Sequence, residues 1–178
     1  MKDALAIHRW LLAHQIHHEI VRLPRPLTSS DNLPEILAAS PETCVAVSVF
    51  VVSGKTGTEA VAVVGSVGDP PGAKAVGAFL GAERIRPATA FTVNSETDYA
   101  DGLVCPLLLP DHMTVLIDQR LIDRIDPDDA VHTATGERCT ALRLRAFHLF
   151  QLMSGKPVDL TTPRTLGLAS LASPMSTA

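Results

Sequence analysis

The sequence predicts an α+β domain in which helices flank a mixed central β-sheet. Two valine-rich segments, at 44–52 and 59–67, are separated by a short polar turn, a pattern typical of a buried hairpin. Segments in which apolar residues recur with helical periodicity lie on both sides of this hairpin. Hydrophobic residues make up 46% of the chain and aromatic residues 4%, so the core must be built from aliphatic side chains, which suits a sheet.

The chain before the hairpin is expected to form a helix, a short strand and a second helix. The first helix is predicted at 3–18, where Asp3 can cap its first turn. The stripe along this helix consists of Ala4, Ile7, Leu11, His14 and His18. An alternating strand is expected at 19–23 and, after a break rich in proline, a short helix at 31–39.

The chain after the hairpin is expected to add two helices, three strands and a closing helix. Residues 73–82 form a helical pattern of small residues, and residues 87–95 form a weaker one. The remaining predicted elements are strands at 113–117, 130–134 and 139–145 and a helix at 146–153. We therefore predict one domain at 1–155, followed by a loosely ordered tail at 156–178 that is rich in Thr, Pro, Ser and Ala.

Composition and charge exclude several classes of function. The formal net charge is −4 and no long basic run is present, which argues against broad electrostatic binding to nucleic acid and leaves room only for a local basic rim around a pocket. No signal-peptide pattern and no apolar run of transmembrane length occur, so we expect no membrane partner. The cysteines are Cys44, Cys105 and Cys139, and their odd number and wide spacing predict a reduced, cytoplasmic protein.

Three local patterns resemble chemical motifs, but their residues favour structural roles. Gly54-Lys55-Thr56 lacks the earlier glycine of a phosphate-binding loop, because position 49 is valine. His14 and His18 have a spacing that suits a metal on a helix, yet no third ligand accompanies them, so we predict no metal. Cys105 precedes a proline and has no evident His-Asp partners, which favours a small buried residue over a nucleophile.

A basic group accompanies the predicted strand at 139–145. It consists of Arg138, Arg143 and Arg145, which form either a solvated face or a contact for phosphate.

Three blocks of sequence together resemble a known family. They are Asp-Tyr-Ala-Asp-Gly-Leu-Val-Cys-Pro at 98–106, Met-Thr-Val-Leu-Ile-Asp at 113–118 and Ala-Thr-Gly at 134–136. In this order and spacing, from about residue 4 to 153, the chain resembles the YbaK/ProX domain, an aminoacyl-tRNA deacylase module that is also inserted in some prolyl-tRNA synthetases. The family shows Gly-Tyr-x-x-Gly-x-x-x-Pro, then an apolar strand that ends in Asp, then a small-small-Gly element.

The resemblance implies a mixed-sheet domain whose cavity accepts the aminoacylated 3′ end of tRNA. It implies hydrolysis in trans of the ester of a mischarged amino acid, without a cofactor, and it names the tRNA end and an aminoacyl-tRNA synthetase as partners. Gly102 and Gly136 would present backbone N–H groups to the ester carbonyl, unless both are only turn glycines. The substrate-binding residues that it implies are Tyr99, Val47, Ser48, Val104, Pro106, Ala134 and Thr135.

Three departures from the family pattern support an alternative function. Val47 occupies the place of the family lysine, Asp98 that of the first glycine, and Ala134 that of a small polar residue. Lys55 and Lys74 are not at the matching place. Valine supplies no charge or donor, so the chain could instead be a binding or regulatory module that recognises an aminoacyl-tRNA end or a small molecule without hydrolysing it.

Overall fold

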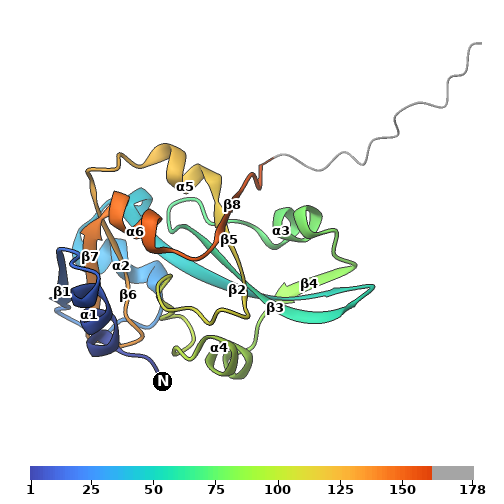
Figure 1. The fold of residues 1–178 in the computed structure, drawn as a ribbon, viewed down its shortest axis with the longest axis horizontal. Helices are drawn as coiled ribbons and strands as arrows, with labels where there is room; N and C mark the ends of the chain where they lie inside the picture. Colours follow the sequence, from blue (N-terminus) through green and yellow to red (C-terminus); the bar gives the residue numbers. More distant parts are fainter. Residues whose placement is uncertain (162–178) are drawn as a thin grey trace, which may run out of the picture.

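One mixed sheet of eight strands organises the computed structural model, which describes residues 1–161 (Figure 1). The strands are β1 (His18–Arg22), β2 (Cys44–Gly54), β3 (Gly57–Ser66), β4 (Arg84–Pro87), β5 (Thr114–Asp118), β6 (Ala130–Ala134), β7 (Thr140–Arg145) and β8 (Lys156–Val158). The helices are α1 (Ala4–Ala13), α2 (Leu33–Leu37), α3 (Ala73–Leu80), α4 (Ala90–Thr97), α5 (Gln119–Arg124) and α6 (Ala146–Leu152). Two 3-10 turns, η1 (Ser30–Asn32) and η2 (Pro41–Thr43), precede α2 and β2.

The strand order confirms the predicted mixed sheet. It runs β1-β7-β6-β2-β3-β5-β8, and β4 pairs with β2 outside this path. The β2–β3 hairpin is antiparallel, as the two valine-rich segments predict, while β6 pairs with β2, β5 with β3 and β8 with β5 in parallel. The sheet is therefore built from the hairpin outward.

The outer edge of β2 is shared by two short partners. β3 covers the opposite edge along its whole length, from Val45 to Gly54. On the outer edge, β6 pairs only with Cys44 and Val45, and β4 pairs only with residues 50–53. Residues 46–49 lie between these partners, so this part of the edge has no neighbouring strand.

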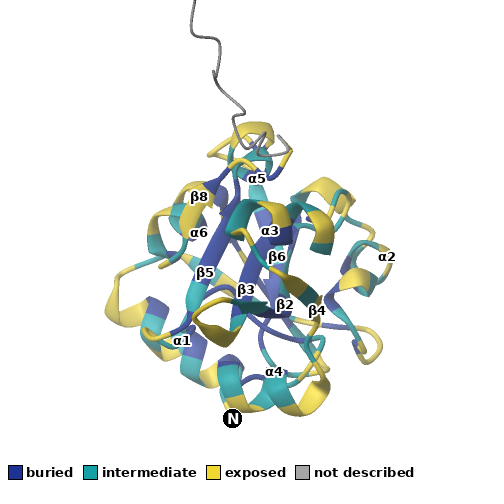
Figure 2. Cartoon of the chain, turned by 90° about the vertical axis from the view of Figure 1, so that its right-hand side faces the viewer, coloured by how far each residue is buried: buried dark blue, intermediate teal, exposed yellow. Residues whose placement is uncertain are grey.

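Helices cover both faces of the hairpin and form separate core clusters. One cluster joins α1, α4 and α6 to the sheet through Leu11, Val93 and Leu149. The other joins α3 to the opposite face of β2 and β3 through residues such as Val76 and Val61. The central strands are buried, whereas α4 exposes much of its outer surface (Figure 2). Among residues 1–161, no helix is both long and apolar enough to cross a lipid bilayer.

Several predicted elements need correction at their ends. The predicted first helix ends early, because α1 stops at Ala13, Gln15 takes a left-handed φ of 56° and His18 already belongs to β1. His14 and His18 are therefore not on one helix. The predicted helix at 87–95 begins only at residue 90, where Thr89 caps α4, because Pro87 pairs with Phe50 in β4. Both β4 and α5 were missed, since each is only four to six residues long.

The ordered domain extends beyond its predicted end at residue 155. β8 begins at Lys156 and pairs with β5, and Leu160 is buried in the cluster below α3. The predicted loose tail is therefore wrong for residues 156–160. Its remaining part, 162–178, lies outside the described residues.

A buried carboxylate fixes α5 to the end of β5. Asp118 is 1% exposed, caps α5 through the Arg120 N–H and pairs with the Arg120 guanidinium at 2.6 Å. Arg120 also binds Asp69 at 2.7 Å, and Arg124 binds the same Asp69 oxygen at 2.8 Å. The two arginines differ mainly in burial, because the Arg120 side chain is 24% exposed and that of Arg124 56%.

We predict that Arg120→Met lowers the free energy of unfolding by about 3 kcal/mol, because it leaves the Asp118 charge buried without its partner. Arg124→Met is the matched control and should cost less than about 1 kcal/mol, since its ion pair is exposed. Urea unfolding of both variants measures the difference. Equal losses in the two variants would contradict the role of the buried carboxylate.

Candidate functional site

An open cleft of about 280 Å³ lies against the unpaired part of the β2 edge. Its residues come from β2, from the end of β4 and the residue after it, from α4 and from the loop that follows α4. They are Val47, Ser48, Val49, Phe50, Pro87, Ala88, Val93, Asp101, Gly102 and Val104. The walls are mostly aliphatic, and Asp101 is the one ionisable residue among them. The cleft therefore suits a ligand held by backbone groups and apolar contacts.

The Val47 peptide groups open toward this cleft. The Cys44 carbonyl accepts the Val67 N–H at 2.8 Å on the β3 side of β2. The Val49 carbonyl accepts the Ala88 N–H at 2.9 Å on the outer side. Because the peptide groups alternate in direction along a strand, those of Val47 point outward like those of Val49. Neither has a partner strand there, which leaves a donor and an acceptor for a ligand.

The opposite wall of the cleft is formed by Gly102 in a left-handed conformation with φ of 77°. A Cβ at this position would lie 2.9 Å from the Thr28 carbonyl oxygen, so only glycine lets the segment 28–30 pack here. The Gly102 carbonyl accepts two hydrogen bonds from Ser30, one from its N–H at 2.8 Å and one from its hydroxyl at 3.1 Å. In the described part of the chain, nothing accepts a hydrogen bond from the Gly102 N–H.

The structure brings four of the predicted site residues together at the cleft. They are Val47, Ser48, Gly102 and Val104. The other five lie behind or beside it and take part in packing and hydrogen bonding. They are Tyr99, Pro106, Ala134, Thr135 and Gly136. Their roles in catalysis or substrate binding stay predictions.

Gly136 and Tyr99 pack directly against each other. A Cβ at Gly136, where φ is 88°, would lie 2.5 Å from the Lys2 carbonyl oxygen and 2.8 Å from a carbon of the Tyr99 ring. The Tyr99 hydroxyl is buried and donates to the Leu107 carbonyl at 2.7 Å. Burial raises the pKa of Tyr99 well above its usual range, so the ring stays neutral and donates.

Thr135 supports the same region from the facing turn. Its hydroxyl lies 2.7 Å from that of Thr140 and accepts the Glu137 N–H at 3.3 Å. Ala134 is fully buried in the cluster that contains Leu33 and Leu103. The turn at 134–136 thus packs beneath the loop that precedes Gly102 and supports it.

The departures from the family pattern have distinct local causes. Val47 is half-buried, its side chain packs against the core, and the residue also lines the cleft. Asp98 ends α4 with φ of 61°, a left-handed position that aspartate tolerates better than most residues. Its carbonyl accepts the Lys2 N–H at 2.7 Å, and it does not line the cleft.

The other candidate groups lie away from the cleft. Burial raises the pKa of Cys105 to about 12, so its thiol carries no charge near neutral pH. His18 contacts His8 at 2.8 Å, between Nε2 and Nδ1, while His14 Nδ1 contacts the Trp10 carbonyl at 2.8 Å. Within residues 1–161, no cluster of three metal-ligating side chains occurs.

The basic group at 138–145 is partly neutralised. Arg143 lies 3.7 Å from Glu19, and Arg145 forms an ion pair with Asp128. These pairs favour the solvated-face interpretation.

Sequence analysis missed seven contributors to the site: Ser30, Val49, Phe50, Pro87, Ala88, Val93 and Asp101. No sequence signal joins Ser30 to Gly102, because 72 residues separate them. Ala88 and Val93 were read as parts of one weak helix. Asp101 is part of the block at 98–106, but no pattern in the sequence distinguishes it as a site residue.

Comparisons with known proteins support the fold. No protein-family model matches the sequence, and no curated protein matches it. A solved structure described as a candidate trans-editing enzyme for prolyl tRNA synthetase is 21% identical, with a TM-score of 0.67 over 86% of this chain and 92% of that one. A hypothetical protein is 20% identical, with a TM-score of 0.68 over 86% and 97%.

A third solved structure comes from computational grafting of linear epitopes onto scaffold proteins. It is 18% identical, with a TM-score of 0.67 over 86% of this chain and 92% of that one. At these identities the likeness shows the fold alone. The chain therefore shares the mixed-sheet fold of the candidate trans-editing enzyme.

We predict that Gly136→Ala lowers the free energy of unfolding by about 2 kcal/mol or more, because the methyl group meets the Lys2 carbonyl and the Tyr99 ring in a strained conformation. Gly54→Ala is the matched control: a Cβ there meets nothing within 4 Å, so we expect a change of less than about 0.5 kcal/mol. Thermal unfolding of both variants checks this. A Gly136→Ala variant as stable as the control would show that the close packing is not required.

Proposed function

We propose that the protein is an aminoacyl-tRNA deacylase that acts in trans and hydrolyses the ester of a mischarged tRNA. The cleft supports this proposal, because it is lined by Gly102 and Val47, whose backbone N–H groups donate to no other group of the described chain, between aliphatic walls. The fold shared with a candidate trans-editing enzyme supports it. The proposed partners are the aminoacylated 3′ end and the synthetase that produces the mischarged tRNA, and the proposed location is the cytoplasm.

The proposed chemistry needs no side-chain base. The Gly102 N–H, with the Val47 N–H on the facing wall, would polarise the ester carbonyl and stabilise the charge that develops on its oxygen. Water adds to the carbonyl carbon, either directly or after a neighbouring hydroxyl of the terminal ribose has replaced the first ester oxygen on that carbon. The carbon–oxygen bond to the ribose then breaks, the ribose oxygen takes the proton, and the free amino acid leaves.

The residues that line the cleft also limit which amino acid an aminoacyl-tRNA substrate can carry. Val47, Val49 and Val104 offer no charged or polar side chain to a substrate side chain. The Asp101 carboxylate has the charge that complements the α-ammonium group of an aminoacyl ester. We therefore propose that small, uncharged amino acids are preferred, with selection by exclusion of larger side chains.

We predict that the protein hydrolyses aminoacyl-tRNAs that carry small uncharged amino acids at least tenfold faster than the uncatalysed reaction. Release of labelled amino acid from a panel of mischarged tRNAs measures this. If no member of the panel is hydrolysed above the uncatalysed rate, the deacylase proposal is wrong.

A second candidate function is a binding module without chemistry, favoured by the absence of any cation among the cleft residues. Val47→Lys restores the family lysine, and Val47→Met controls for side-chain length without charge. For a natural deacylase, we expect Val47→Lys to change kcat/KM by less than about tenfold. Hydrolysis that appears only in Val47→Lys would favour the binding module.

Ser30 is predicted to act as a positioning residue, because both of its donors hold the Gly102 carbonyl. Ser30→Ala removes one of these bonds, and we expect kcat for ester hydrolysis to fall by about tenfold while KM stays nearly constant. Ser30→Thr keeps the hydroxyl and should restore kcat. A parallel loss in both variants, or a change in KM alone, would point to a purely structural role.

A further inference from the structure

An aromatic side chain stands exposed beside the cleft. Phe91, in the first turn of α4, is 82% exposed, the highest value among the exposed large hydrophobic residues that the structure describes. Ala88 and Val93, on either side of it in the sequence, both line the cleft. Phe91 points to solvent from a different side of α4 than Val93, and the rim is defined here as this first turn of α4 together with β4.

Two arginines without ion pairs precede this aromatic residue. Arg84 and Arg86 alternate with Ile85 along β4, and Ile85 packs into the cluster below α3. Since alternate residues of a strand point to opposite faces, both arginines point to the other face of the sheet. Both are exposed, and neither forms an ion pair within residues 1–161. In Figure 2, β4 and α4 face the viewer and both carry exposed residues.

The groove beside Arg86 and the cleft are lined by neighbouring residues. Arg86 pairs with Val51 and lines a groove of about 380 Å³ together with Thr92 of α4. The next residues along, Pro87 and Val93, line the cleft. The groove and the cleft therefore have no lining residue in common but take consecutive residues of β4 and of α4.

Of the surfaces around the cleft, the rim is the one whose charges suit an anionic chain. Asp101 lies on the opposite wall and would repel phosphate. Arg25, near α2, is already paired with Glu35 at 2.5 Å. Glu59 and Glu96 line the outer part of the groove, which limits the favourable surface to a few nucleotides. An exposed aromatic ring with unpaired arginines is the combination that binds single-stranded nucleic acid.

We propose that β4 and the first turn of α4 bind the single-stranded 3′ end of an RNA, with Phe91 stacking on a base and Arg84 and Arg86 contacting phosphates. This inference rests on the proposed function, since an ester held in the cleft carries its nucleotides out over the rim. The surface supplies the local positive charge that a chain of net charge −4 needs to hold RNA.

The test uses the full chain and a fluorescent single-stranded RNA that ends in 5′-ACCA-3′ with a free 3′ hydroxyl. Anisotropy titrations compare the wild type with Phe91→Ala, Phe91→Trp and a double variant with Arg84→Gln and Arg86→Gln. We expect Phe91→Ala to weaken binding about tenfold and Phe91→Trp to preserve it, because stacking needs a ring. The double variant should weaken binding and lower the slope of log K against log salt by about 0.7 per arginine.

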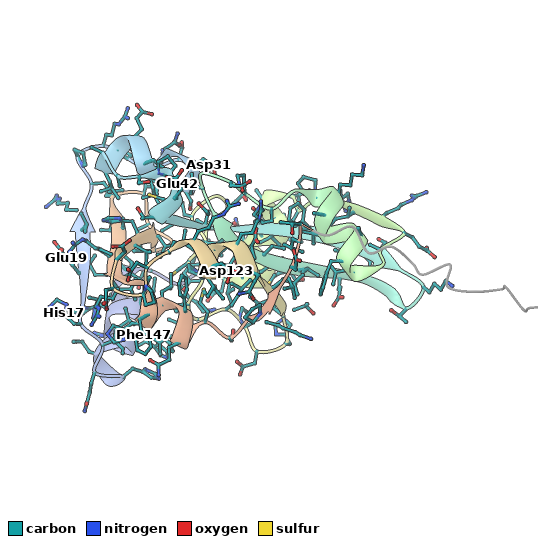
Figure 3. All side chains as sticks on the ribbon, turned by 90° about the horizontal axis from the view of Figure 1, so that it is seen from above. His17, Glu19, Asp31, Glu42, Asp123 and Phe147 are labelled. Atoms are coloured by element: carbon teal, nitrogen blue, oxygen red, sulfur yellow. The ribbon has the colours of Figure 1, made fainter. Side chains whose placement is uncertain are left out.

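Matched controls come from the other end of the molecule. Phe147 is an exposed phenylalanine on α6 (Figure 3). Arg22 is an exposed arginine on β1 without an ion pair in the described residues. Phe147→Ala and Arg22→Gln should leave both affinity and salt slope unchanged. Equal losses in controls and rim variants, or a wild type that does not bind the RNA, would overturn the proposal.

A second measurement separates this inference from the proposed function. A 2′(3′)-O-aminoacyl-adenosine fills the cleft but ends before the rim, so its hydrolysis should be the same in the wild type and in Phe91→Ala. With the full aminoacyl-tRNA, Phe91→Ala should raise KM about tenfold and leave kcat unchanged. An unchanged KM would overturn the rim proposal even if the enzyme is active. RNA binding through Phe91 without hydrolysis of either ester would overturn the deacylase function alone.

Discussion

The divided outer edge of β2 is the constraint on which the site depends. A strand edge without a partner exposes peptide donors and acceptors, and most folds cover such edges. Here β6 covers one end and β4 the other, so only residues 46–49 remain uncovered. The gap is too short to template another strand but long enough to receive a small ligand. The cleft thus arises from the lengths of two neighbouring strands rather than from any special side chain.

The second wall of the cleft shows how a fold can hold one peptide group in a defined orientation. The Gly102 carbonyl is bound twice by Ser30, and the lack of a side chain lets the Thr28 backbone approach. The carbonyl bound by Ser30 belongs to the Gly102–Leu103 peptide, and the Gly102 N–H, in the preceding peptide, donates to no group of the described chain. Behind it, Tyr99 and Gly136 pack without a gap and support the loop. Backbone groups held in this way suit a reaction that lacks a side-chain acid or base.

The cleft and the rim differ in the chemical character of their side chains. The cleft itself contains no cation, and its apolar walls suit the acyl part of a substrate. The exposed ring of Phe91 and the guanidinium groups of β4 lie outside it, where they suit the nucleotide part. Under the proposed function, separate surfaces for the two parts of one ligand would let an acidic protein with few aromatic residues hold an anionic substrate.

Local sequence alone determined the hairpin, the aliphatic core and the approximate positions of most helices. The valines of β2 and β3 specify a buried hairpin by composition and turn spacing, and the glycines at 102 and 136 specify sharp turns. Only the tertiary structure decided which residues meet: Ser30 with Gly102, β4 with β2, and β8 with β5. These pairings join distant segments and depend on where strands begin and end, while single-sequence patterns report only neighbours along the chain.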